Sequence, residues 1–311
     1  MRIAIVIPCH NVERLLPEAL ASVAAQQYRD LELVLVDDGS NDGTAAVMEE
    51  WARTHAHVKV LRLAHTGAAH ARNAGLKACT ADWVQFLDAD DTLHPDKISG
   101  QVALLAAQPH ADVVVGDYEQ LLPNGRLIPV EALHDQPWMA LIKTRMGTTS
   151  ANLWRRAAVE RAGAWDESLE SSQDYDLLFR MLKQVAQVCW DRRVTTTVLK
   201  RVTGSISRTD EHANWQRYIA LRAHMRDHLR EAGPREHATE IAVLDQYLFM
   251  AIREVGRHDA GEAALLYERL MPRGFQPEES RAITRRYLHL FNLLGFAGAE
   301  HMLHLLKRPN A

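Results

Sequence analysis

The stretch DWVQFLDADD, residues 82–91, joins an apolar run to three carboxylates within four positions. Asp88, Asp90 and Asp91 directly follow a segment that has the character of a buried strand. Neighbouring unit charges repel by roughly 1–4 kcal/mol at contact distance and an effective dielectric near 20. Two arrangements would relieve this repulsion: a cation lies among the carboxylates, or some of them cap a turn and point apart into water.

Three further apolar runs precede this segment and alternate with helical patterns. We expect strands at residues 2–8, 31–40, 58–64 and 82–88, and helices at residues 13–26, 44–55 and 68–79. Continuous apolar strands separated by helices of ten or more residues are typical of a parallel sheet with helices on its faces. Ligands bind such sheets at the carboxyl ends of the strands. VDDGS (36–40) and FLDADD (86–91) both lie at such ends, which predicts a binding site there.

The remainder of the chain divides into a mixed part and a helical part. A helix is expected from Pro95 to about Gln108, then a strand pair with a turn at residues 123–125, and mixed short elements up to about residue 205. From about Glu211 onward the apolar spacing is helical only. We therefore predict an α/β domain at residues 1–210 and a helical C-terminal appendage at residues 211–311.

Composition narrows the class of protein. The 311 residues are 47% hydrophobic and 24% charged, as in an ordinary globular protein, and the net charge of -4 argues against nucleic-acid binding. Cys9, Cys79 and Cys189 form no C-x-x-C pair, so a reducing cytoplasm is expected. No apolar run reaches the roughly 18–20 residues that span a bilayer. Neither G-x-G-x-x-G nor a P-loop occurs.

The acidic stretches allow a structural and a functional interpretation. In FLDADD, Asp91 or Thr92 could cap the next helix while Asp88 is solvated. Alternatively, Asp88 and Asp90 hold Mg²⁺ or Mn²⁺ against a diphosphate, because these hard cations prefer carboxylate and phosphate oxygens.

The other polar motifs are equally open when each is taken alone. Residues 33–44 suit a strand-to-helix turn, or Asp38 accepts hydrogen bonds from a base edge while Asp37 supports the turn. Arg72 is a surface residue of a helix, or it neutralises phosphate. Ser171 and Asp174 fit the helix capping pattern S-x-x-D, in which Asp174 would be a cap and not a catalyst.

Taken together, six stretches are far more specific. IVIPCHN, LVDDGSNDGT, GAAHARNAG, FLDADD, GAWDE and QDYDLLFR, in this order, resemble the inverting family 2 glycosyltransferases, which have the GT-A fold. The resemblance covers roughly residues 1–207 and leaves out the helical tail. It implies a GT-A domain with a nucleotide-sugar-binding half at residues 1–100 and an acceptor half at residues 101–210.

The resemblance also implies roles on the donor side. Pro8 would border the nucleotide base, and Asp38 would contact its pyrimidine ring. Arg72 would lie near the base or the phosphates. Asp88 and Asp90 match the D-x-D motif of the family, with Asp88 towards the ribose and Asp90 on a metal that both carboxylates approach.

On the acceptor side, Asp174 matches the presumed general base. Gln173 replaces the usual Glu beside it, so Asp174 has less reason for a raised pKa. Val202 stands where the family often has a His that assists at the metal or diphosphate. Because Val202 cannot take that role, metal affinity or donor class can differ here from the family pattern.

The resemblance implies Mn²⁺- or Mg²⁺-dependent transfer of a sugar, with inversion, from a nucleotide donor to an acceptor hydroxyl. Among the possible donors, it favours UDP-sugars. The acceptor would be a glycan or a lipid-linked molecule in cell-surface polysaccharide or glycan assembly. One alternative is a non-catalytic sugar-nucleotide or glycan-binding module of the same fold. A nucleotidyltransferase is a further alternative, although PCHNVERLLPEA lacks the Gly-rich basic loop that it usually needs after the first strand.

The C-terminal tail is both basic and apolar. Residues 280–308 carry five Lys or Arg side chains against Glu300 alone, together with Leu288, Phe291, Leu294 and Phe296. This pattern suits a helix that packs on the bundle or on a second copy of the chain. It also suits a peripheral contact with anionic lipid at the inner face of a membrane.

Overall fold

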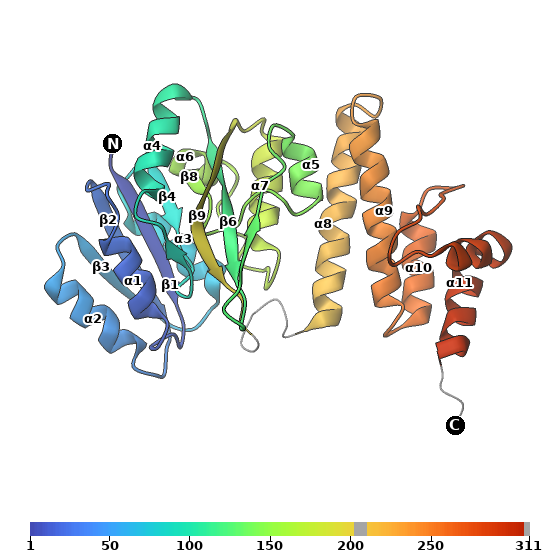
Figure 1. The fold of residues 1–311 in the computed structure, drawn as a ribbon, viewed down its shortest axis with the longest axis horizontal. Coiled ribbons are helices and arrows are strands. Elements are labelled where there is room, and N and C mark those ends of the chain that lie inside the picture. The colour runs from blue at the N-terminus through green and yellow to red at the C-terminus, as the bar shows by residue number, and fades with distance from the viewer. Residues whose placement is uncertain (202–209, 308–311) are drawn as a thin grey trace. The chain divides into compact units, whose positions relative to one another are not determined.

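The computed structural model describes residues 1–201 and 210–307, the last four of these by backbone alone. Contacts divide the chain into two compact units, Met1–Ser205 and Ile206–Ala311. The first unit is a sheet with helices packed on it, and the second consists of helices (Figure 1). The α/β fold class with C-terminal helices is therefore confirmed.

The first four strands form the parallel part of the sheet. They lie in the order β3-β2-β1-β4, with β1 (Ile3–Cys9), β2 (Leu31–Asp38), β3 (Val58–Leu63) and β4 (Trp83–Phe86). Ile5 pairs with Leu33, and Ile3 pairs with Trp83, which places all four carboxyl ends at one edge. The expected strands are confirmed, and so is their common direction.

The second part of the sheet mixes strand directions. It continues from β4 through β8 (Leu153–Arg155), β6 (Val113–Leu121), β9 (Val188–Leu199) and β5 (Thr92–Leu93), with β7 (Leu127–Val130) beside β6. Strands β8, β7 and β5 run antiparallel to their neighbours, whereas β6 and β9 are parallel. The expected turn between β6 and β7 is present, and Gly125 adopts a positive φ of 77° in it.

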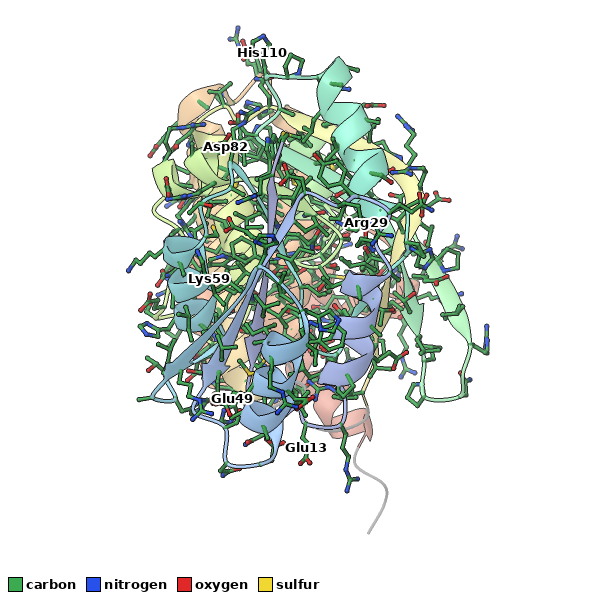
Figure 2. The ribbon with its side chains drawn as sticks, turned by 90° about the vertical axis from the view of Figure 1, so that its left-hand side faces the viewer. Glu13, Arg29, Glu49, Lys59, Asp82 and His110 are labelled. Carbon is green, nitrogen blue, oxygen red and sulfur yellow. The ribbon has the colours of Figure 1, made fainter. Side chains whose placement is uncertain are left out.

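Helices cover the faces of this sheet. They are α1 (Leu16–Ala24), α2 (Thr44–Thr54), α3 (Ala68–Ala78), α4 (Lys97–Ala107), α5 (Pro137–Ile142), α6 (Arg156–Arg161) and α7 (Gln173–Lys183). Ile3, Ile5 and Ile7 of β1 are fully buried in the core. Charged side chains such as Glu13, Glu49 and Lys59 lie on the outside of the unit (Figure 2). This separation fits the apolar strands and amphipathic helices expected from the sequence.

The second unit contains α8 (Glu211–Ala232), α9 (Ala238–Val255), α10 (Ala260–Leu270) and α11 (Arg285–Lys307). Its core is aromatic: Phe249 contacts the rings of Tyr287, Phe291 and Phe296. Two of the apolar tail residues are thus buried inside the unit, while Leu294 remains 45% exposed. Arg308, part of the predicted basic tail, lies outside the described residues. No helix in the described ranges is long and apolar enough to cross a membrane.

Candidate functional site

The loop after β4 holds Asp88 and Asp90, and each of these carboxylates faces an arginine. Oδ1 of Asp88 lies 2.7 Å from Nη2 of Arg72, which donates a hydrogen bond to it. Oδ2 of Asp90 lies 2.8 Å from Nε of Arg201 in an ion pair. In the structure, therefore, charge repulsion in this loop is relieved by two cationic side chains from distant parts of the chain.

Asp91, the third carboxylate, points inward and fastens the loop to its surroundings. Its Oδ2 accepts a hydrogen bond from Ser150 Oγ at 2.7 Å, and its Oδ1 accepts one from the Leu199 amide at 3.0 Å. Burial, followed by the two neighbouring carboxylates, raises the pKa of Asp91 well above its ordinary value. Helix α4 begins after Asp96, and Thr92 lies in β5. The helix-cap interpretation of Asp91 or Thr92 is therefore wrong.

The donor set of this loop fits a hard divalent cation. The side chains of Asp88 and Asp90 are 36% and 16% exposed, so their oxygens remain within reach of a ligand. Burial and the Asp88 carboxylate raise the pKa of Asp90, which means that the protein around it compensates its charge incompletely. Carboxylate oxygens in this state suit Mg²⁺ or Mn²⁺.

Arg72 connects the acidic loop to the start of α7. It lies on α3, is 7% exposed, and donates from Nη1 to Oε1 of Gln173 at 2.8 Å while Nη2 holds Asp88. Its guanidinium also lies 4.7 Å from the centre of the Trp165 ring. A buried arginine with this many fixed contacts is not the surface residue of the simpler interpretation.

Asp174 follows Gln173 in the first turn of α7. The helix begins at Gln173 and Ser172 precedes it at a φ of 58°, without a side-chain cap hydrogen bond. A capping box would need Ser171 in the place of Ser172, so that interpretation of Asp174 is wrong. Oδ1 of Asp174 accepts a hydrogen bond from the Tyr175 amide at 3.0 Å.

The environment of Asp174 sets its charge. Burial raises the pKa of Asp174, and the Arg72 guanidinium opposes this shift. The pKa of Asp174 is thus raised although Gln173 places no second carboxylate beside it, because removal of the carboxyl from water is the largest cause. Nearby Tyr118 has a raised pKa through burial, and Asp174 and Asp91 add to the rise. Asp174 thus lies within electrostatic reach of Asp88 and of Tyr118.

Sequence reasoning missed Arg201 and Tyr118. Arg201 directly precedes Val202, which stands in place of the family His. Nothing in the sequence links Arg201 to Asp90, 111 positions earlier. Val202 itself lies outside the described residues. Tyr118 belongs to β6, and its proximity to Asp174 depends on the packing of α7.

A second cluster of polar residues lies at the ends of β1, β2 and β3, at the same edge of the sheet. Pro8 pairs with Val36 of β2 and lies beyond the last residue of β1 that pairs with β4, so its missing N–H interrupts no pairing there. Asp37 accepts the Ser40 amide at 3.0 Å and thus supports the turn, as expected. These contacts fix the conformation of the backbone that leads into the polar cluster.

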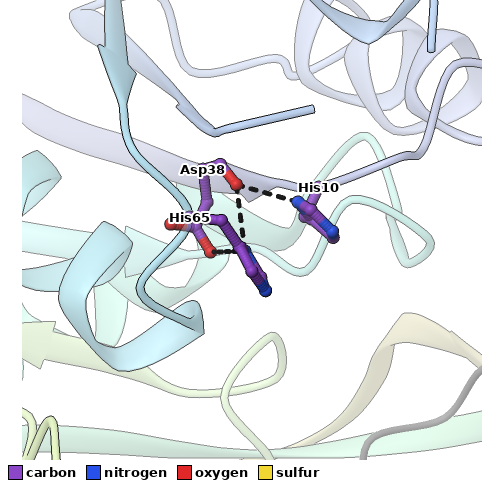
Figure 3. Close-up of side chains that lie close together, drawn as sticks. All are labelled: His10, Asp38 and His65. Atoms are coloured by element: carbon purple, nitrogen blue, oxygen red, sulfur yellow. Dashed lines mark hydrogen bonds and ion pairs between the residues drawn. The ribbon is translucent and has the colours of Figure 1, made fainter. Parts of the chain in front are cut away.

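Asp38 is 2% exposed and anchors the loop after β3. Its Oδ1 accepts the Thr66 amide at 2.9 Å, and its Oδ2 accepts the Gly67 amide at 2.9 Å and lies 2.9 Å from Nδ1 of His65. The rings of His65 and His10 stack with centres 3.9 Å apart (Figure 3). Gly67 has a φ of 111°, a backbone conformation that favours glycine. No pattern in the sequence indicates that Asp38 holds this loop in place.

A family model and several curated proteins match the N-terminal part of the chain. The family model described as "Glycosyl transferase family 2" matches residues 4–153. The O-antigen biosynthesis protein RfbC of Myxococcus xanthus is 31% identical over 191 residues, which are 60% of this chain and 15% of that protein. Curated relatives are matched over only 15–44% of their length.

Solved structures align over the whole chain. Residues 1–349 of Staphylococcus aureus TarS align with a TM-score of 0.69 at 17% identity, covering 100% of this chain and 93% of that one. The same fragment is also known in complex with UDP-GlcNAc. The mannosyltransferase PcManGT of Pyrobaculum calidifontis, in complex with GDP-Man and Mn²⁺, aligns with a TM-score of 0.56 at 19% identity, covering 99% and 88%.

Proposed function

Residues 4–153 of this chain are a family 2 glycosyltransferase domain, and from this premise we propose that the protein transfers a sugar, with inversion, from a nucleotide donor to an acceptor hydroxyl. One observation carries the proposal. Arg72 holds both Asp88, in the acidic loop after β4, and Gln173, the neighbour of Asp174 in α7. One hydrogen-bond network thereby links Asp88, the proposed contact on the donor side, to the helix start that carries the candidate base Asp174.

On the donor side, Asp88 and Asp90 would hold Mn²⁺ or Mg²⁺, which supplies positive charge for the leaving diphosphate. Arg72 keeps Asp88 oriented, and Arg201 neutralises Asp90 when no cation is bound. Since Val202 has no polar group, we propose that Arg201 then contacts a phosphate of the donor, the task that a His at 202 would otherwise share. Guanidinium groups suit this task because their donors match phosphate oxygens.

On the acceptor side, Asp174 takes the proton from the attacking hydroxyl. Its carboxylate is held at the start of α7 by the Tyr175 amide, and its raised pKa makes it a better base than an ordinary Asp. A single attack on the anomeric carbon opposite the leaving diphosphate inverts the configuration of the sugar. Asp174 faces the acceptor, and its loss should spare nucleotide binding.

The nucleotide base would lie at the ends of β1 and β2, beside Pro8 and Asp38. Residues 1–100 would then bind the donor, and residues 101–210 would supply the acceptor side. A UDP-sugar is proposed as donor, supported by the TarS complex with UDP-GlcNAc, while the GDP-Man complex of PcManGT makes GDP-sugars the first comparison.

The acceptor is proposed to be a glycan or lipid-linked precursor of a cell-surface polysaccharide, a class supported by the name of the relative RfbC. The three cysteines are buried free thiols, which suits work in a reducing cytoplasm.

Donor hydrolysis tests the proposal, because water replaces the unknown acceptor. The full chain is incubated with a panel of UDP- and GDP-sugars in Mn²⁺, in Mg²⁺ and in EDTA, and nucleotide release is measured. We expect release from one donor class with a metal present and little release from the Asp174→Asn variant. Binding of a nucleotide sugar without any release would favour the non-catalytic module. If the chain neither binds nor hydrolyses any donor of the panel, the proposal is refuted.

A further inference from the structure

Lys97 places an amino group inside the first unit, in contact with the strand that leads into the acidic loop. It is the first residue of α4 and is 0% exposed. Its Nζ donates hydrogen bonds to Oε1 of Gln85, which belongs to β4, and at 2.8 Å to Oε1 of Gln101. Lysine is almost never fully buried unless it is paired with an opposite charge, so two neutral amide partners are unusual.

The hydrogen bonds of the two amides fix their orientation and suit a neutral amine. Nε2 of Gln85 donates to the Ser150 carbonyl oxygen at 2.8 Å. Nε2 of Gln101 donates to the Ala151 carbonyl oxygen at 3.3 Å. A carbonyl oxygen only accepts, so each Oε1 must face Lys97, whose neutral amine has two N–H groups for these two acceptors. Burial lowers the pKa of Lys97 to about 7, so the neutral form prevails at pH 8.

Gln85 passes this support on to the acidic loop through Ser150. The amide of Gln85 holds the Ser150 carbonyl group, which fixes where the serine hydroxyl lies. That hydroxyl accepts the Asp88 amide at 3.1 Å and donates to Oδ2 of Asp91 at 2.7 Å. A chain of hydrogen bonds and backbone thus connects Lys97 to both Asp88 and Asp91. Buried networks of this kind are rigid when every member is satisfied, and loss of Nζ would leave two buried amide oxygens unpaired.

We propose that Lys97 is a positioning residue of the donor site: it orients two glutamine amides that hold residues 150–151, and these set the geometry of Asp88 and Asp91. Because Lys97 is fully buried, it acts through these contacts and not by touching a ligand. The first consequence is an acidic loop that is ordered before any ligand binds. The second consequence, which rests on the proposed function, is tighter binding of Mn²⁺ or Mg²⁺, since less ordering is needed on binding.

Hydrogen exchange in the metal-free chain, followed by mass spectrometry, tests the positioning without any ligand. Lys97→Met keeps the length of the side chain and removes its donors. At pH 8 we expect amides in residues 87–92 and 148–152 to exchange about tenfold faster or more, relative to the rest of the first unit. This is the size of effect expected when buried acceptors lose their partner.

Glu32→Met is the matched control for this measurement. Glu32 is buried as well, and its carboxylate accepts the amides of Thr80 and Ala81 at 2.6 and 2.7 Å before β4 begins. The control should lose stability in thermal melts without accelerating the two segments relative to the rest of the unit. Unchanged relative exchange in Lys97→Met, or the same acceleration in Glu32→Met, would overturn the proposal. If Lys97→Met fails to fold, Gln101→Leu replaces it, because it removes one of the two acceptors, and the same outcomes apply.

Binding of Mn²⁺ alone, measured by electron paramagnetic resonance at pH 8, tests the consequence for the donor site. Lys97→Met and Ser150→Ala should each weaken Mn²⁺ binding by about tenfold, the lower end of what loss of an outer-shell partner costs. The double variant should bind little more weakly than either, because both changes break one chain of contacts. Wild-type Mn²⁺ affinity in Lys97→Met, or strictly additive losses, would overturn this consequence. If the wild type binds no Mn²⁺ while the exchange result holds, the proposed function fails and the positioning role stands.

Discussion

Replacement of Asp174 by Asn separates a catalytic carboxylate from a structural one. Asn has nearly the same shape, and its amide oxygen can still accept the hydrogen bond that the Tyr175 amide donates at 3.0 Å. The change therefore removes the charge and the capacity to take a proton, and leaves the start of α7 intact.

The stability effect of this change follows from the pKa of Asp174. Burial raises this pKa in the folded protein, so the folded state holds the proton up to a higher pH than the unfolded state does. As pH rises from the unfolded pKa through the folded one, stability falls, and at pH 7 the whole cost of the buried charge is present. Asp174→Asn should therefore melt at the same temperature as the wild type, or above it, at pH 7.

The rate should respond in the opposite way. Loss of a positioned general base lowers turnover by about 10²–10⁴-fold. Nucleotide affinity should remain unchanged, because we propose that Asp174 faces the acceptor and not the diphosphate. The raised pKa also predicts that wild-type turnover declines on the acid side at a pH above the ordinary range of an aspartate.

Three measurements on purified protein decide the matter: donor hydrolysis, thermal melting and UDP calorimetry. Asp176→Asn is the matched control, since Asp176 lies on the same helix but forms an ion pair with Arg180 at 2.7 Å. That control should lose stability and keep its rate. A well-folded Asp174→Asn protein with near-normal turnover would refute the assignment of the base.

Three further predictions test other parts of the account. Asp90→Asn should abolish Mn²⁺-dependent turnover with the fold intact by circular dichroism; turnover that persists unchanged in EDTA would contradict the metal site. Arg201→Ala should tighten binding of Mn²⁺ alone, measured by electron paramagnetic resonance, because it frees Asp90. The same change should weaken UDP binding by about 10–100-fold, the value of a charged hydrogen bond. If the Mn²⁺ affinity and the UDP affinity both rise or both fall, the proposed role of Arg201 is contradicted. Burial lowers the pKa of Lys97 to about 7, so urea unfolding should show wild-type stability rising by about 2 kcal/mol from pH 7 to 9 relative to Lys97→Met, and parallel pH profiles would exclude this.

The sequence was sufficient for the parts of the fold that depend on local pattern. Apolar runs and helical spacing located β1 to β4 and the helices between them, and the parallel order placed Asp38 and Asp88 at one edge. Residue type alone also marked Arg72 as a candidate for a charged site.

The remaining features depend on contacts between distant segments. Arg201 reaches Asp90, and Asp91 turns inward to Ser150 and the Leu199 amide, only because β9 and the loop before β8 pack beside the acidic loop. The capping pattern at Asp174 failed for a local reason, since Ser172 adopts a positive φ and moves the start of the helix by one residue. The periodicity of a sequence does not indicate at which of two adjacent residues a helix begins.

We propose above all that the acidic loop binds a nucleoside diphosphate with the help of a divalent cation. Calorimetric titration of the wild-type chain with UDP and with GDP, in Mn²⁺ and in EDTA, tests it most directly. We predict that one nucleotide binds in Mn²⁺, and that EDTA or the Asp90→Asn change weakens this binding by about tenfold or more, as expected when a charged contact is lost. Failure of both nucleotides to bind, or equal affinity in Mn²⁺, in EDTA and in Asp90→Asn, would contradict the claim.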